Sequence, residues 1–121
     1  MSQDPQWMVE FYQDVRGHRP VEEWLDTLPD KEHARLRRGF DMLKRFGVQL
    51  VMPHARHLRG KLFELRVASG RRDFRVLYFA AAGRRLILLH GFAKSTAKTP
   101  EKDLAIAERR LAEFEDRLRG V

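Results

Sequence analysis

Three short segments in the second half of the chain alternate with a period of two, and they limit the folds open to it. They are KLFELRV (61–67), DFRVLYFA (73–80) and RLILLHGF (85–92). Side chains on a β-strand point alternately to its two faces, so this period predicts strands. Ser69-Gly70 and Ala82-Gly83 supply turn residues at hairpin spacing. We therefore expect an antiparallel meander.

Two helices are expected before this meander. Pro20 suits the first position of a helix that Pro29 ends, and Asp30 can cap a second helix that reaches about Phe46. Gly47 follows as a stop signal. These residues predict a helical hairpin. A first strand is expected over 9–15, and the segment 48–60 is expected to form a strand fragment and then an irregular basic loop.

A third helix is expected from Pro100 to just before Gly120, with Thr99 as its cap. Its apolar stripe must cover either the open face of the sheet or a partner helix. The stripe consists of Leu104, Ala107, Leu111, Phe114 and Leu118. Together the elements predict an α+β fold with a small, mostly antiparallel sheet, an N-terminal helical hairpin and a C-terminal helix. We expect the helices on one face of the sheet and the other face free.

Size and composition favour one folded domain over residues 1–121. The chain is 43% apolar and 34% charged, which excludes a disordered protein, and no apolar run approaches the roughly 20 residues of a membrane span. It has no cysteine, which removes disulfides and thiolate metal sites. The start MSQDPQWMVEF, with Asp4 and Pro5, does not match a secretory signal, so we expect a cytoplasmic protein.

The positive charge of the chain is concentrated in one segment. The whole sequence carries +7, whereas residues 54–98 hold eleven Lys and Arg against two acidic residues, which gives +9. The rest of the chain is therefore slightly acidic. A single basic segment predicts a polyanionic partner.

Two arginines of this segment are expected to lie side by side. A turn near Ser69-Gly70 brings Arg66 and Arg75 within one cross-strand step, with Glu64 on the same face as Arg66. We expect both guanidinium groups to point toward solvent. The patch is either an ordinary surface ion pair or a phosphate clamp, since guanidinium groups can bind phosphoryl oxygens in a bidentate manner.

At this point the sequence resembles a known family. GKLFELRV, then FRVLYF, then LILLHGFAKSTAKTP and a helical tail are similar in order and spacing to the RelE/ParE superfamily of toxins from toxin–antitoxin systems. The likeness is strongest to the phage-derived HigB-type branch and covers about residues 7–117. It implies a RelE-like fold.

The resemblance also implies a function and partners. A toxin of this kind is an RNA interferase that enters the ribosomal A site and cuts mRNA, and a cognate antitoxin, often a helix-turn-helix protein, silences it. Such cleavage uses the 2′-hydroxyl as the nucleophile and needs no metal or other cofactor. Two alternatives stay open: a ParE-like inhibitor of DNA gyrase, and an inactive homologue that still binds its antitoxin.

The resemblance assigns candidate roles to several residues. Arg75 matches the arginine of the central strand and is expected at the scissile phosphate, with Arg66 as the second phosphate contact. Lys94 is expected to stabilise or protonate the leaving oxygen. Lys98 is a weaker candidate for contact with RNA.

Two residues are candidates for the general base. RelE has two lysines at alternating positions of the strand that ends in Arg66, and here those positions hold Leu62 and Glu64. Glu64 is one candidate for the base, and Lys61 is the other.

Further RNA contacts are expected from basic residues around these strands. They are Arg59, His57, Arg72 and His90, although His90 also fits a structural role at the end of a strand. We expect no zinc site at His54 and His57, because no cysteine or acidic ligand is close by.

Overall fold

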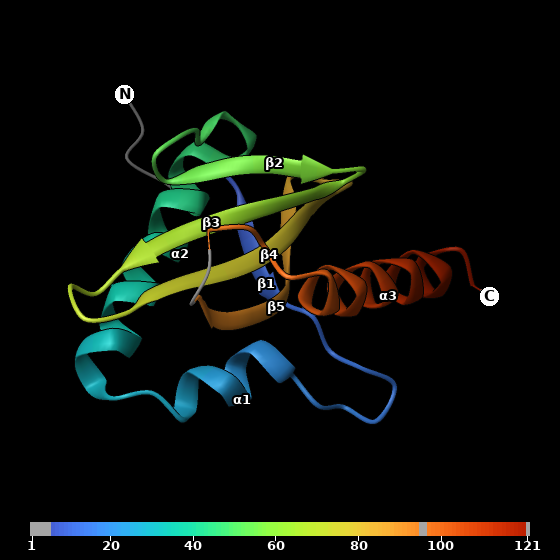
Figure 1. Cartoon of the computed structure of the whole chain (residues 1–121). Coiled ribbons are helices and arrows are strands. Elements are labelled where there is room, and N and C mark those ends of the chain that lie inside the picture. Colours follow the sequence, from blue (N-terminus) through green and yellow to red (C-terminus); the bar gives the residue numbers. More distant parts are fainter. Residues whose placement is uncertain (1–5, 95–96, 121) are drawn as a thin grey trace.

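The structure, a computed structural model, describes residues 6–94 and 97–120. Asp4, Pro5, and Ser95 and Thr96 of the HGFAKSTAKTP motif lie outside the described residues. Within the described residues, five strands, three α-helices and one short 3-10 helix follow one another. Figure 1 shows their arrangement. The elements are β1 (Met8–Phe11), α1 (Pro20–Asp26), α2 (Asp30–Phe46), the 3-10 helix η1 (Gly47–Gln49), β2 (Ala55–Arg59), β3 (Leu62–Ala68), β4 (Asp73–Ala81), β5 (Arg85–Lys94) and α3 (Glu101–Leu118).

The strands form one sheet in the order β1-β5-β4-β3-β2. The pairs β2–β3, β3–β4 and β4–β5 are antiparallel, and only the short edge strand β1 runs parallel to its neighbour β5. The structure confirms the α+β fold with its mostly antiparallel sheet, N-terminal helical hairpin and C-terminal helix. The three strands predicted from the period of two begin or end within two residues of the predicted bounds.

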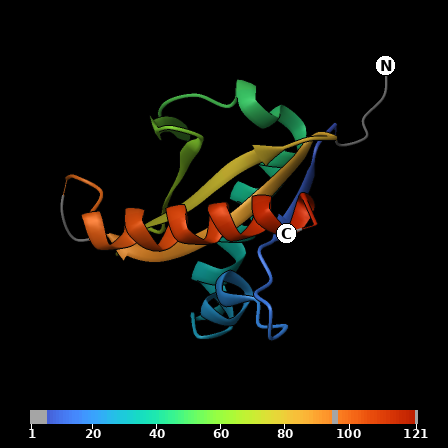
Figure 2. The ribbon, with the colours of Figure 1, turned by 90° about the vertical axis from the view of Figure 1, so that its right-hand side faces the viewer.

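The expectation that one sheet face is free was wrong. One hydrophobic core lies between the sheet and helices α1 and α2, and a second lies between the opposite face and α3. Figure 2 shows α3 crossing in front of the sheet with α2 behind it. The central strand β4 had to be covered twice, since Phe74 and Val76 face the first core while Leu77 and Phe79 face the second. An apolar strand of this kind is buried on both faces.

The segment 48–60 also differs from its prediction. Its second half, expected as an irregular loop, is strand β2, which pairs with β3 from Ala55 to Arg59 and places Arg56 opposite Glu64. At the N-terminus, β1 ends at Phe11, short of the predicted residue 15, and the chain turns around Asp14, which accepts the backbone N–H groups of residues 16 and 18.

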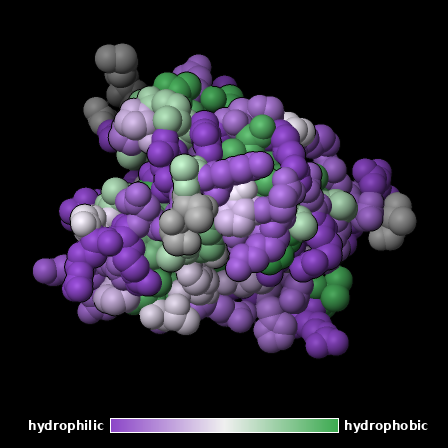
Figure 3. Space-filling model, viewed as in Figure 1, coloured by the Kyte–Doolittle hydropathy of each residue, from purple (hydrophilic) through white to green (hydrophobic). Residues whose placement is uncertain are grey.

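The outside of the molecule is mostly polar on the face shown in Figure 3, which has the viewpoint of Figure 1. Hydrophilic side chains cover the β3–β4 hairpin at the left of this view, and apolar ones gather toward the top. Among the helices of the described residues, none combines the length and apolar character that crossing a membrane requires.

Candidate functional site

A group of charged side chains lies on the face of the sheet that α3 partly covers. Strand register places Arg66 directly opposite Arg75, and Arg56 directly opposite Glu64. Directly paired residues point to the same face, and residues two apart on one strand share a face, so the four side chains converge. The predicted proximity of Arg66, Arg75 and Glu64 is confirmed. Lys94 lies on this face too, because it pairs with Asp73, two residues before Arg75 on β4. We call the four basic residues on this face the cationic cluster: Arg56, Arg66, Arg75 and Lys94.

Glu64 is the carboxylate around which the cluster is built. It is 0% exposed, and its two oxygens have different partners. Oε1 accepts the Nε–H of Arg56 at 3.1 Å and lies 3.5 Å from Nε of Arg75, while Oε2 accepts the hydroxyl of Thr99 at 2.5 Å. A buried carboxylate needs such partners, because an unpaired buried charge is costly. Glu64 therefore holds side chains from β2, β4 and the segment before α3 together.

Arg75 lies deeper than the sequence led us to expect. It is 4% exposed, so the expectation that its guanidinium points to solvent was wrong. Nη1 donates to the carbonyl oxygen of Phe74 at 2.9 Å, and the ion pair with Glu64 lacks the geometry of a hydrogen bond. Burial lowers the pKa of Arg75, and the charge of Glu64 acts against this shift. Arg75 is thus a cation fixed beneath the surface.

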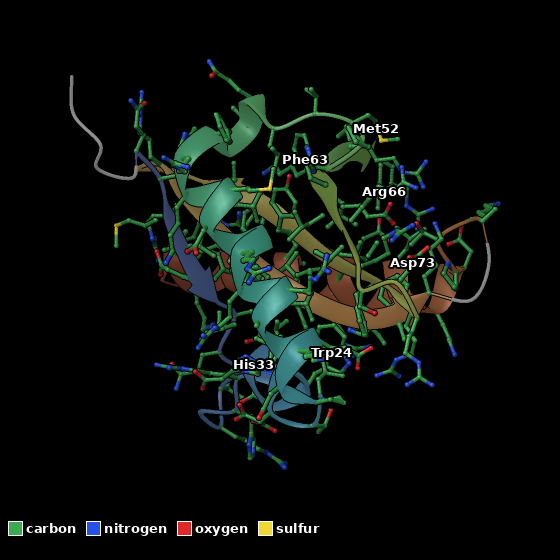
Figure 4. The ribbon with its side chains drawn as sticks, turned by 90° about the vertical axis from the view of Figure 1, so that its left-hand side faces the viewer. Trp24, His33, Met52, Phe63, Arg66 and Asp73 are labelled. Atoms are coloured by element: carbon green, nitrogen blue, oxygen red, sulfur yellow. The ribbon has the colours of Figure 1, made fainter. Side chains whose placement is uncertain are left out.

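Arg66 and Lys94 are the more accessible cations beside it, and both are half-buried. Figure 4 shows Arg66 next to Met52, whose sulfur lies 3.2 Å from Nη1 of Arg66. Lys94 ends β5 opposite Asp73. Burial lowers the pKa of the Lys94 ammonium, and the positive charge of Arg75 lowers it further. A lysine in this setting releases its proton more readily than one in water.

His90 lies on the same face of β5 as Phe92 and Lys94. Its Nε2 is 2.6 Å from Oδ1 of Asp103 in the first turn of α3, and its ring stacks on Phe92 at a centroid distance of 5.5 Å. Burial lowers the pKa of His90, although Asp103 opposes the shift. Within residues 6–94 and 97–120, no three His, Cys, Asp or Glu side chains are grouped so that they could hold a metal ion.

Comparison with known proteins identifies the family. The model of the family described as phage-derived Gp49-like proteins (DUF891) matches residues 23–112, which is well over half of the chain. The chain belongs to this family. The matched range runs from α1 into α3 and contains the whole cationic cluster, Glu64, His90 and Asp103. No curated protein matches this Gp49-like chain.

Two predicted site residues of the Gp49-like chain bind α3 instead of joining the cluster. The Lys61 ammonium pairs with Glu115. The Arg59 guanidinium donates to Glu101, and it also donates to Glu108 at 2.8 Å. Because Glu101, Glu108 and Glu115 are spaced by seven residues, they lie along one side of α3. These ion pairs connect the β2–β3 hairpin to the helix.

Two other predicted residues, His57 and Arg72, also lie apart from the cluster. The ring of His57 is 2.7 Å from the carbonyl oxygen of Gly60, on the opposite sheet face. Arg72 binds Glu32 of α2, with Nη2 and Oε1 2.6 Å apart. Lys98 is exposed in the segment between β5 and α3. Of the ten side chains proposed from the sequence, the structure thus gathers Arg75, Arg66, Lys94, Glu64 and His90 on one face.

Two members of the site, Arg56 and Thr99, were not predicted from the sequence. Arg56 lies on strand β2, where an irregular loop is expected from the sequence. Thr99 was expected to cap α3, but its hydroxyl donates to Glu64 and the helix has no side-chain cap. The signal for Arg56 was present in the alternation of Ala55, Arg56, His57 and Leu58. No local pattern pointed to the bond between Thr99 and Glu64, which are 35 residues apart.

Proposed function

We propose that this protein is the toxin of a toxin–antitoxin pair and cleaves mRNA in the ribosomal A site, in the cytoplasm. The observation that carries the proposal is the cationic cluster, in which four cations from four strands surround one buried carboxylate. Membership of a phage-derived family fits the phage-derived HigB-type toxins that the sequence resembles. A cognate antitoxin of the helix-turn-helix class would silence the toxin.

Arg66 and Arg75 serve the phosphate in this proposal. Arg66 is half-exposed and forms no ion pair with a carboxylate of the described residues, so its N–H groups can bind the phosphoryl oxygens of the scissile linkage. Arg75 and Arg56 add fixed positive charge from beneath and beside it. Charge placed in advance of the reaction stabilises the crowded phosphorane that forms during cleavage.

Lys94 and His90 carry the protons. The 2′-oxygen attacks the adjacent phosphorus, its proton passes to His90, and the bond from phosphorus to the 5′-oxygen breaks as Lys94 gives that oxygen a proton. The lowered pKa of Lys94 suits a proton donor, and the lowered pKa of His90 keeps its ring neutral and able to accept. The products are a 2′,3′-cyclic phosphate and a free 5′-hydroxyl, and no metal is required.

Glu64 is assigned a positioning role in place of the base. Its complete burial and its bonds to Arg56 and Thr99 leave it no surface toward a substrate. Lys61 is not the base either in this scheme, since its ammonium is held by Glu115 on α3.

The test is cleavage in a cell-free translation reaction, with cut sites mapped by primer extension. Wild type should cut mRNA only when it is being translated. Arg66→Gln and Lys94→Met should each lower the rate by about 100-fold, the loss typical of one missing charge-stabilising or proton-donating group.

Arg109→Gln is the matched control, because Arg109 is an exposed cation on α3 and pairs with no carboxylate of the described residues. It should leave the cleavage rate unchanged. Intact message together with loss of gyrase supercoiling would support the ParE-like alternative and refute the proposal. Intact message with active gyrase would refute it in favour of an inactive, antitoxin-binding homologue.

A further inference from the structure

A second basic surface lies on the α2 side of the sheet and is continuous with the cationic cluster. We propose that it binds the sugar-phosphate backbone of RNA and leads that strand from the cluster, around the end of β3, onto α2. This inference rests on the proposed function, because it takes the cluster as the place where RNA is cut. It adds a binding surface of defined residues outside the cleavage site.

The route around the sheet exists because β2 is shorter than β3. Pairing between the two strands begins at Ala55 opposite Leu65, and the last contact toward this end is the backbone N–H of Arg66 donating to the carbonyl oxygen of His54 at 2.8 Å. Val67 and Ala68 extend beyond this pairing. Figure 4, viewed from the α2 side, shows Arg66 and Asp73 near this same end of the sheet. Side chains from both sheet faces can therefore line one groove here.

Such a groove is present beside the end of β3, with a volume of about 440 Å³. It shares Arg66 and Arg75 with the cationic cluster, and it also contains Arg35 and Arg38 of α2. Asp73 is its one acidic lining residue. The groove thus joins the cluster on the α3 side to the exposed basic side of α2.

A cleft of about 790 Å³ continues from this groove, between the first half of α2 and the β3–β4 hairpin. Arg35 and Arg38 line both hollows, so the two are contiguous. The basic residues of the cleft are Lys31, Arg35, Arg38, Arg71 and Arg72. Its acidic lining residue, Glu32, is already engaged by Arg72 and by the hydroxyl of Ser69. We call the basic residues of the groove and the cleft the basic track.

Several members of the basic track carry charge that no ion pair neutralises. Among the described residues, no carboxylate forms an ion pair with Lys31, Arg35, Arg38 or Arg71. Basic residues on the α3 side differ, since Arg59 and Lys61 are held by glutamates of that helix. The track has therefore kept charges that other parts of the molecule neutralise internally.

The arrangement favours a nucleic-acid backbone over an acidic protein. Lys31, Arg35 and Arg38 are spaced by four and three residues, so they form a row of about 10 Å along one side of α2. A row of cations in an open groove matches the regular phosphates of a strand. A protein partner would be expected to bury apolar anchors, and the cleft offers mainly charged side chains and alkyl stems.

The experiment compares two double variants that remove the same charge. Arg35→Gln with Arg38→Gln alters the track, whereas Arg16→Gln with Arg109→Gln alters exposed cations elsewhere. The probes are fluorescent 2′-O-methyl oligoribonucleotides, a tetranucleotide and a dodecanucleotide, which the 2′-hydroxyl mechanism cannot cleave. Fluorescence anisotropy gives Kd at several salt concentrations, and sedimentation with empty ribosomes gives binding to ribosomal RNA in place.

Wild type should bind the dodecanucleotide at least tenfold more tightly than the tetranucleotide, and the track variant should lose most of this difference. Loss of two phosphate contacts should also lower the slope of log Kd against log salt by roughly 1.4, since each contact to a single strand contributes about 0.7. The control variant should retain both the length dependence and the slope.

The ribosome experiment identifies the source of the RNA. If the track variant loses the length dependence and also sediments less with empty ribosomes than the control, ribosomal RNA occupies the track as well. If it loses the length dependence but sediments like the control, the track binds only the strand that is cut. A track variant that binds free oligonucleotides like wild type refutes the inference. If the track and control variants behave alike in both measurements, the inference is wrong. It is also wrong if polyglutamate binds wild type through the track but does not compete with either the oligonucleotides or the ribosomes, because the track would then be a site for an acidic protein. If the protein cleaves mRNA but its track binds no RNA, this inference is wrong and the proposed function stands. If RNA binding depends on the track but the protein does not cleave mRNA, the proposed function is wrong and this inference stands.

Discussion

Replacement of Glu64 by leucine tests whether this buried carboxylate holds the cationic cluster together. The change leaves Arg75, which is 4% exposed, without its counter-charge, and it leaves the buried hydroxyl of Thr99 without an acceptor. Breaking a buried ion pair costs about 3–5 kcal/mol. A domain of this size has a free energy of unfolding of about 5–15 kcal/mol, so we expect Glu64→Leu to remove about a fifth or more of it.

The assay is urea unfolding at pH 7, followed by the fluorescence of Trp7 and Trp24, which lie against the core beneath α1 and α2. At this chain length, each 1 kcal/mol lowers Tm by about 4 °C, so a fall of roughly 12–20 °C should accompany the change. Glu101→Leu is the control. The Glu101 side chain is 67% exposed and pairs with an exposed arginine, so its loss should cost less than about 1 kcal/mol.

The double variant Glu64→Leu with Arg75→Met separates charge pairing from packing. Removing both members of a buried pair is often neutral, so the double variant should recover at least about 2 kcal/mol relative to Glu64→Leu alone. Two results would refute this explanation. Glu64→Leu could lower the free energy of unfolding no more than Glu101→Leu does, or the loss in the double variant could equal the sum of the losses in Glu64→Leu and Arg75→Met.

Two further predictions concern β5. Gly91→Ala should lower the free energy of unfolding by about 1–3 kcal/mol in the same urea assay, because an added Cβ would lie 2.4 Å from ring atoms of Trp24. An unchanged free energy of unfolding would mean that α1 packs less tightly on β5 than the structure indicates. For His90, burial holds the pKa in the folded state below the ordinary value of about 6.5, so the unfolded chain binds the proton first. The free energy of unfolding should therefore fall as pH drops below about 6.5 toward the lowered pKa. Urea unfolding over a pH series should show a smaller fall for His90→Gln than for wild type. Equal pH dependence in the two proteins would contradict a lowered pKa of His90 in the folded state.

The strands of the meander could be predicted because their signals are local. Alternation marks β3, β4 and β5, and the Ser69-Gly70 turn sets the register that brings Arg66 opposite Arg75. The place of α3 could not be read in the same way. An apolar stripe shows that a helix is covered, but it does not say which surface covers it. The apolar residues on both faces of β4, such as Val76 and Leu77, were the sign that two layers of helix would be needed.

The site was predictable where strand register decides it and unpredictable where α3 does. Arg66, Arg75 and Glu64 follow from register alone. The depth of Arg75 depends on how the segment before α3 crosses the sheet and places Thr99 on Glu64. The positions of Lys61 and Arg59 likewise depend on glutamates of α3 more than forty residues away in sequence. Contacts of this kind leave no periodic pattern in the sequence.

Burial of Arg75 changes how the cluster can act on a phosphate without removing its charge. Four cations and one carboxylate give a net charge of +3, and Glu64 reduces the repulsion that would otherwise drive the cations apart. Because Arg75 and Arg56 are held by Glu64, they need not reorganise when a negative charge develops nearby. Fixed charges in a poorly solvated site act more strongly than mobile ones in water. A buried guanidinium is therefore compatible with the proposed chemistry, provided that Arg66 makes the direct contact with the phosphate.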